Sequence, residues 1–238
     1  MHVKLNILIM AVVAVFVLSI VGSAHADMVG MNYAIGGLNV TGTAGAVPQG
    51  NWNNESIVHN ASSQSGGLAT LKDDGNATVI GMSTSWTANA AYGTGASAGG
   101  TDTTLLYGGP ESQDNVYGTF SISIAGIPYA EYDLYVYVKG WTAGRTGEAR
   151  LNGVTGSEIG FDTYKDFPGS HSRATSTATQ GTYVLWEGLT ASSVTVDVRR
   201  QSSNVIISGF QVVEVPEPAT MSLLALGGMA LLKRRKRI

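Results

Sequence analysis

The sequence predicts an all-β protein: a β-sandwich with jelly-roll or Greek-key connections, flanked by an N-terminal signal helix and a short C-terminal membrane-sorting helix. Two observations predict the sandwich. Several segments alternate apolar and polar residues with a period of two, which places each set of side chains on its own face of a sheet. Turn-forming residues separate these segments, and residues 27–214 show no amphipathic helical pattern. A shallow β-barrel is the alternative architecture.

Four segments give the strongest strand patterns. Residues 116–124, 132–138 and 193–199 alternate regularly, whereas residues 205–213 are almost continuously apolar, as expected of a strand covered on both faces. Residues 87–104 consist mainly of small and polar residues, and we expect a long surface loop there. Weaker strand candidates are residues 37–41, 67–72, 77–82, 104–107, 147–151 and 182–186.

The segment Asp73-Asp74-Gly75-Asn76 separates two strand candidates and predicts a hairpin turn. The side-chain oxygens of Asp73, Asp74 and Asn76 could also bind calcium. The spacing and the final glutamate of an EF-hand loop are missing, so a plain turn is the favoured interpretation. We therefore expect no metal and no other cofactor.

The N-terminus has the pattern of a secretory signal peptide over residues 1–26. Lys4 precedes an apolar run over residues 5–21, and Ala24 and Ala26 form a small-x-small cleavage site. We expect export by the Sec machinery and cleavage by signal peptidase between Ala26 and Asp27. An uncleaved N-terminal anchor is the alternative.

The C-terminal residues 215–238 form a second targeting segment. A short motif is followed by an apolar run over residues 221–232 and by a basic cluster over residues 233–237. The apolar run has 12 residues, against the roughly 20 that a stable transmembrane helix needs, and a basic end tends to stay in the cytoplasm. Such a tail can hold a chain in the inner membrane only transiently. The motif residues are Pro216, Glu217, Pro218, Ala219 and Thr220.

This tail resembles the PEP-CTERM sorting signal of Gram-negative bacteria. The resemblance covers about a tenth of the chain, and its motif, apolar run and basic cluster stand in the family's order. It implies recognition of Pro216-Glu217-Pro218 by a membrane-embedded exosortase. It also implies delivery to the cell surface or to the extracellular polysaccharide matrix.

The composition of residues 27–214 fits one exported domain. The segment is long enough for a sizeable core, and the chain has no cysteine, so neither disulfides nor thiolate metal sites can form. It contains 8 Lys and Arg against 16 Asp and Glu, a net charge of −8. This balance excludes a nucleic-acid partner, which would need a basic face.

The domain has a looser resemblance of its own. Residues 46–54 and 207–212 look like a recurrent family of PEP-CTERM ectodomains, which are similar in outline to galactose-binding-like and carbohydrate-binding jelly rolls. The resemblance supports a fold more than an activity, because sandwiches host many functions.

No catalytic signature stands out in the sequence. A nucleophile elbow and a His-Glu-x-x-His motif are both missing. Glu131 and Asp133 point to one strand face, as a glycoside hydrolase pair could, but solvated charges at a strand start explain them better. We expect a protein that is not an enzyme.

Exposed aromatic rings beside polar groups are the more plausible site, because sugars present flat apolar faces ringed by hydroxyls. Trp52 lies beside Asn53 and Asn54 in a loop-like context, and Trp141 precedes Arg145 after a predicted strand. These five residues are the candidate glycan-binding residues. Trp86 and Trp186 end apolar segments and are assigned to the core.

The expected function is association with extracellular polysaccharide, with glycan binding as its specific form. A structural, self-associating matrix protein without a defined ligand site is the second possibility. A glycan-active hydrolase is the third.

Overall fold

The computed structural model describes residues 27–60, 62–93 and 100–216. Asp27–Val215 form one compact unit. The predicted signal helix and the predicted sorting helix both lie outside the described residues, and so does most of the sorting motif.

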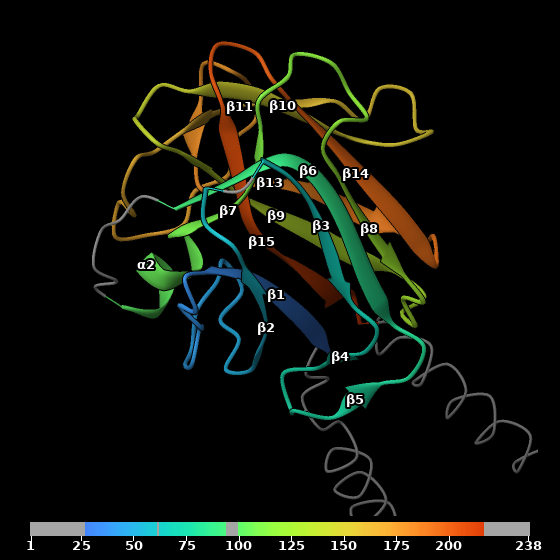
Figure 1. Ribbon diagram of the computed structural model, residues 1–238. Helices are drawn as coiled ribbons and strands as arrows, with labels where there is room; N and C mark the ends of the chain where they lie inside the picture. The colour runs from blue at the N-terminus through green and yellow to red at the C-terminus, as the bar shows by residue number, and fades with distance from the viewer. Residues whose placement is uncertain (1–26, 61, 94–99, 217–238) are drawn as a thin grey trace, which may run out of the picture. The chain divides into compact units, whose positions relative to one another are not determined.

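The strands of this unit form two facing layers (Figure 1). The first layer contains, in spatial order, β3 (Ser62–Leu68), β6 (Ser83–Gly93), β8 (Ser121–Ala125), β14 (Ser193–Arg200), β10 (Thr146–Leu151), β11 (Ile159–Thr163) and β12 (Gln180–Gly181). The second contains β2 (Trp52–Ile57), β1 (Met28–Ile35), β15 (Val205–Glu214), β9 (Tyr132–Gly140) and β13 (Tyr183–Leu189). This arrangement confirms the prediction of an all-β protein.

A single strand joins the two layers. β7 (Gly108–Ser112) pairs with β6 on one side and with β15 on the other, so 13 strands form one hydrogen-bonded system. A separate small hairpin consists of β4 (Leu71–Lys72) and β5 (Thr78–Val79). The one helix of the described ranges is α2 (Thr101–Leu105).

The main hydrophobic core lies between the layers. The inward-facing residues of the alternating strands fill it, including Ile122 and Val196 from the first layer and Val136 and Phe210 from the second. A smaller cluster around Tyr137 covers the other face of the second layer. Apolar burial in both clusters stabilises the fold by roughly 25 cal/mol per Å² of apolar surface removed from water.

The predicted strand over residues 205–213 is confirmed, and its continuous apolar character has a structural cause. β15 pairs with β1, β7 and β9, and both of its faces are covered. The ladder with β9 is irregular between Ile207 and Gly209. A side chain at Gly209 would place Cβ 2.2 Å from the carbonyl oxygen of Met31, so only glycine allows β1 to approach this closely.

Several segment predictions were wrong. Residues 87–104 are not a loop throughout, because β6 continues to Gly93 and α2 begins at Thr101. The small residues Ala88 and Ala91 are buried and belong to the core. Residues 104–107 leave a helix rather than form a strand, residues 37–41 form no strand, and residues 116–120 form a turn before β8. β1, β2, β7 and β11 lie outside every predicted strand.

Replacing Phe210 by alanine should lower the free energy of unfolding by about 3–5 kcal/mol, because it opens a cavity at a fully buried position of the central strand. Val116→Ala is the control, since Val116 is 54% exposed and should change stability by less than about 0.5 kcal/mol. Urea denaturation measures both values. Equal losses in the two variants would contradict this account of the core.

Candidate functional site

Three aromatic rings lie together at one end of the sandwich. Trp141 is 39% exposed, and its ring centroid lies 3.8 Å from that of Tyr92. The Tyr92 ring lies 4.9 Å from the imidazole of His59. We call His59, Tyr92 and Trp141 the aromatic patch. The other three tryptophans are buried, so the patch is where the chain opens an indole ring to solvent.

Two strand ends and one backbone hydrogen bond bring the patch together. Tyr92 is the penultimate residue of β6, and Trp141 directly follows β9. The amide of Asn60 donates to the carbonyl oxygen of Ala91 at 3.1 Å, which holds His59 beside the end of β6. The rings therefore rest on the strand ends of a rigid sheet.

A pocket of about 370 Å³ lies beside the patch and shares Tyr92 with it. Hydrogen bonds hold its polar side chains: Gln113 Nε2 donates to Glu111 Oε2 at 2.8 Å, and the backbone N–H of Gln113 donates to Asn89 Oδ1 at 3.0 Å. The pocket thus presents amide and carboxylate groups in fixed positions. Its lining residues are Asn60, Ser62, Asn89, Ala90, Ala91, Tyr92, Glu111 and Gln113.

A buried row of side chains runs across three strands behind this site. Glu111 on β7 and Lys139 on β9 lie opposite Ile206 of β15, so the three side chains share one face of the sheet. Glu111 and Lys139 are both buried. Burial lowers the pKa of Lys139 to about 8, although Asp166 opposes this shift.

Arg145 braces the turn that carries Trp141. Its Nε donates to Thr142 Oγ1 at 3.2 Å, and its Nη1 donates to the carbonyl oxygen of Asn204 at 3.0 Å. The predicted candidates Trp141 and Arg145 thus lie on one turn, although Arg145 is occupied in holding it.

Trp52 does not lie in a loop, and the prediction that it forms an exposed sugar-binding surface was wrong. It begins β2 and is only 5% exposed. Its Nε1 donates to the carbonyl oxygen of Gln49 at 3.0 Å, and its ring meets Tyr137 edge-on. Trp52 is a core residue of the small cluster that covers the second layer.

Asn53 and Asn54 are likewise used inside the fold. The Asn53 side chain bonds the backbone of Gly30 and exchanges two hydrogen bonds with the backbone of Lys72. Asn54 Oδ1 accepts from Asn32 Nδ2 and from the Val40 amide, both at 2.8 Å. These side-chain amides hold neighbouring segments against the parallel pair of β1 and β2. The local sequence, which is rich in asparagine, does not predict these long-range hydrogen bonds.

The carboxylates of the predicted hairpin turn also have structural partners. Asp73 Oδ1 accepts from the Ala77 amide at 2.8 Å, and Asp74 Oδ1 accepts from the Asn51 amide at 3.0 Å. Asn76 Oδ1 accepts from Lys72 Nζ. The three residues that the sequence offered as calcium ligands thus form structural hydrogen bonds in and around the turn between β4 and β5. Within the described residues, no group of three or more His, Cys, Asp or Glu is arranged to hold a metal ion.

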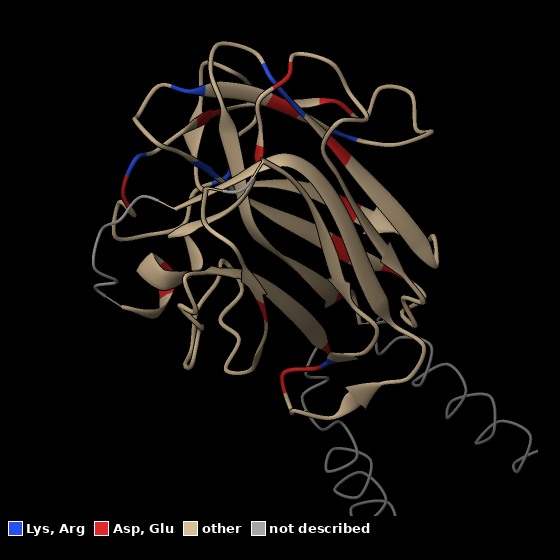
Figure 2. Ribbon diagram, in the orientation of Figure 1, with Lys and Arg blue, Asp and Glu red and all other residues tan. Residues whose placement is uncertain are grey.

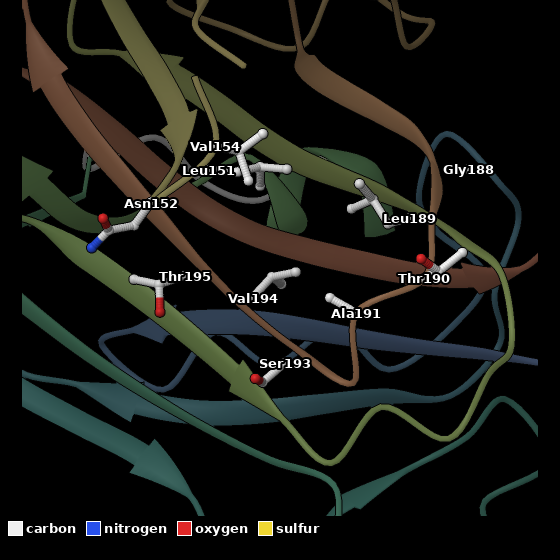
Figure 3. Close-up of a pocket in the computed structure, with 10 residues that line it drawn as sticks. All are labelled: Leu151, Asn152, Val154, Gly188, Leu189, Thr190, Ala191, Ser193, Val194 and Thr195. Atoms are coloured by element: carbon white, nitrogen blue, oxygen red, sulfur yellow. The ribbon is translucent and has the colours of Figure 1, made fainter. Parts of the chain in front are cut away.

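Figure 3 shows a second pocket, of about 510 Å³, between the β10–β11 turn and the β13–β14 hairpin. Its lining has no aromatic or ionisable side chain and consists of Leu151, Asn152, Val154, Gly188, Leu189, Thr190, Ala191, Ser193, Val194 and Thr195. Such a lining supplies neither a stacking surface nor an acid or base.

The carboxylates of Glu131 and Asp133 lie near the β13–β14 hairpin. Asp133 Oδ1 accepts from the Gly188 amide at 3.0 Å and so braces the hairpin. The carbonyl oxygen of Glu131 accepts from the Val215 amide at 2.9 Å, while its side chain is exposed.

One Asp-His-Thr arrangement could be mistaken for catalytic machinery. Asp102 Oδ1 lies 2.9 Å from His171 Nε2, and His171 Nδ1 lies 3.1 Å from Thr182 Oγ1. Thr182 is only 1% exposed, and its hydroxyl accepts from the Ser172 amide at 3.0 Å. A hydroxyl that substrate cannot reach does not serve as a nucleophile, so the arrangement ties α2 to Thr182, which lies between β12 and β13.

Charged residues are sparse in the domain, and its helix is short. Figure 2 shows Lys, Arg, Asp and Glu as short segments scattered over a mostly uncharged ribbon. Of the part of the chain that the structure describes, no helix has the length and apolar character needed to cross a membrane.

Ala24 and Ala26 of the predicted cleavage site lie outside the described residues, as do Glu217, Pro218, Ala219 and Thr220 of the sorting motif.

The stability of the fold should rise between pH 7 and pH 9 by about 1 kcal/mol through Lys139. The folded pKa of about 8 lies below the usual 10.5, so the folded state binds fewer protons in this window and unfolding becomes less favourable. Lys139→Met should remove the rise, and Lys72→Met, at an exposed lysine, should keep it. Urea denaturation between pH 7 and pH 9 measures the free energy of unfolding of each variant. If it changes with pH equally in both variants, Lys139 is not the group responsible.

The comparison with protein families concerns the end of the chain. A family model described as the PEP-CTERM protein-sorting motif matches residues 214–237. A search of curated proteins gave no match. The match confirms the predicted sorting motif, of which Pro216 directly follows the compact unit. The chain therefore carries a PEP-CTERM protein-sorting motif at its C-terminal end, and this motif supports an exported protein that is sorted by an exosortase.

Proposed function

We propose that the domain associates with extracellular polysaccharide and binds glycan at the aromatic patch. The observation that carries this proposal is the half-exposed ring of Trp141, supported by Tyr92 and adjoining a pocket of fixed amide and carboxylate groups. A pyranose ring has an apolar C–H face and a rim of hydroxyls. An indole face and a polar pocket side by side match both features.

The sorting route supports the same proposal. An exported PEP-CTERM protein reaches an environment in which polysaccharide is an abundant polymer, so a modest site is sufficient for retention. The net charge of −8 over residues 27–214 disfavours binding through a broad electrostatic surface. A local site built on stacking and hydrogen bonds is the better match to this composition.

The proposal includes no catalysis. A role without catalysis is supported by the structural hydrogen bonds that two carboxylates make. Asp133 accepts from the backbone of the β13–β14 hairpin, and Glu111 accepts from Gln113 at the wall of the pocket. A hydrolase of the common type needs two carboxyl groups facing one glycosidic bond. A structural, self-associating matrix protein is the alternative function, and the experiment below distinguishes it.

Trp141→Ala should weaken binding of the folded domain to a glycan by about tenfold or more, because truncating a central aromatic anchor removes most of the stacking surface. Trp141→Tyr should retain most of the affinity. Affinity electrophoresis with neutral, uronic-acid and amino-sugar polymers, followed by calorimetry on those that bind, measures the effect.

Val154→Ala is the matched control, since Val154 is also an exposed apolar residue but lies in the turn after the far end of β10. It should leave the affinity unchanged. Binding that survives Trp141→Ala would move the site elsewhere. A well-folded domain that binds none of the polymers would overturn the proposal, and concentration-dependent assembly in sedimentation velocity would then support the structural alternative.

A further inference from the structure

The two ends of the domain, Asp27 and Glu214, lie side by side at one end of the second layer, which we call the sorting edge. β1 and β15 are antiparallel neighbours, so the first residue of the domain lies beside the last residue of its final strand. The amide of Glu214 donates to the carbonyl oxygen of Asp27 at 2.8 Å. In return, the backbone nitrogen of Asp27 donates to Glu214 Oε2 at 3.3 Å.

The sorting motif leaves this edge without a spacer. The amide of Val215 donates to the carbonyl oxygen of Glu131 at 2.9 Å, and Pro216 is the next residue. The family match itself begins at Glu214, inside β15. The last paired residues of the sandwich are therefore also the first residues of the sorting signal.

Carboxylates dominate this edge. Burial raises the pKa of Tyr129, and the negative charges of Asp27, Glu214 and Asp73 raise it further, so all three lie close to one phenol. Arginine side chains form ion pairs elsewhere in the domain, in Arg150–Asp197, Arg173–Glu187 and Arg199–Glu148. None of these pairs neutralises the three carboxylates near Tyr129.

Removal of the predicted signal peptide would change the charge at this point. Hydrolysis of the bond between Ala26 and Asp27 consumes one water, leaves a carboxylate on Ala26 and turns the backbone nitrogen of Asp27 into an ammonium group. That nitrogen already lies within hydrogen-bonding distance of Glu214 Oε2. A neutral contact would become a charge-assisted one, which is shorter and stronger.

We propose that Glu214 is a positioning residue for sorting: it binds the ammonium group that signal cleavage creates on Asp27, and so fixes the start of the sorting motif on the sandwich edge. Signal cleavage would then precede firm attachment of the motif to the folded domain. The sorting enzyme would meet a motif whose first residues, Glu214 and Val215, are held by the sandwich. This inference rests on the predicted cleavage site and does not depend on glycan binding.

The first test measures the ammonium group itself. The domain from Asp27 to Pro216 contains both hydrophobic clusters of the compact unit and serves as the sample. Its α-amino group is labelled by ¹³C reductive methylation and titrated by NMR. Glu214→Gln should lower the pKa of this group by about half a pKa unit relative to the wild type.

Glu131→Gln is the matched control, because it removes a carboxylate from the same edge while Glu131 meets the tail only through its backbone oxygen. It should leave the α-amino pKa nearly unchanged. Equal shifts in the two variants would show a diffuse field rather than a specific pair and would overturn the proposal. N-terminal sequencing of the exported chain that places cleavage away from Asp27 would also overturn it.

The second test follows processing in the full chain. Pulse-chase labelling in an exosortase-containing host measures conversion of the wild type and of Glu214→Gln, Glu214→Asp and Glu131→Gln. Glu214→Gln should slow conversion at least about twofold, with partial rescue by aspartate and no effect of Glu131→Gln. Unchanged conversion in Glu214→Gln would overturn the positioning role, whatever the outcome of the glycan experiment.

Discussion

The pairing of β15 is the constraint on which the rest of the structure depends. This strand shares backbone hydrogen bonds with β1, β7 and β9, and its inward residues Phe210 and Val212 fill the main core. Without β15, β1 and β9 would have no strand between them in the second layer. β7, which joins the two layers, would lose its partner in that layer. A strand with three partners and two covered faces cannot accept charge, which explains its continuous apolar sequence.

The aromatic patch and the sorting edge lie at opposite ends of β9. Trp141 follows the last residue of this strand, whereas Glu131 precedes its first. β9 rises by about 3.3 Å per residue, so its nine residues separate the two by roughly 30 Å. A polymer held at the patch therefore leaves the sorting edge free, and the two proposed roles do not compete for one surface.

Alternation predicted the all-β class and the strands β8, β9 and β14 with their inward-facing residues, because period two reports directly which side chains a sheet buries, and a continuous apolar run predicted the central strand β15. The aromatic patch was predicted only through Trp141. Tyr92 stands in a run of small residues that is typical of a loop, yet Ala88 and Ala91 of that run are buried in the core. The prediction of an exposed site at Trp52, Asn53 and Asn54 was wrong for the converse reason. Polar neighbours in the sequence suggested exposure, but the side chains have partners far away in the chain, such as Gly30 and Asn32. Such partners are set by tertiary contacts that no local pattern contains.

The position of β15 also determines when the domain can finish folding. It is the last strand to be synthesised, yet it occupies the middle of the second layer, and its pairing with β1 joins residues about as far apart as the domain permits. Loop closure over such a distance is slow, and β1 has an unsatisfied edge until it occurs. The sandwich is therefore completed only after residues 205–214 have been exported, and these residues directly precede the rest of the sorting segment in the chain. The topology thus makes the strand that completes the domain the one that directly precedes the sorting segment, so folding and sorting depend on the same stretch of chain.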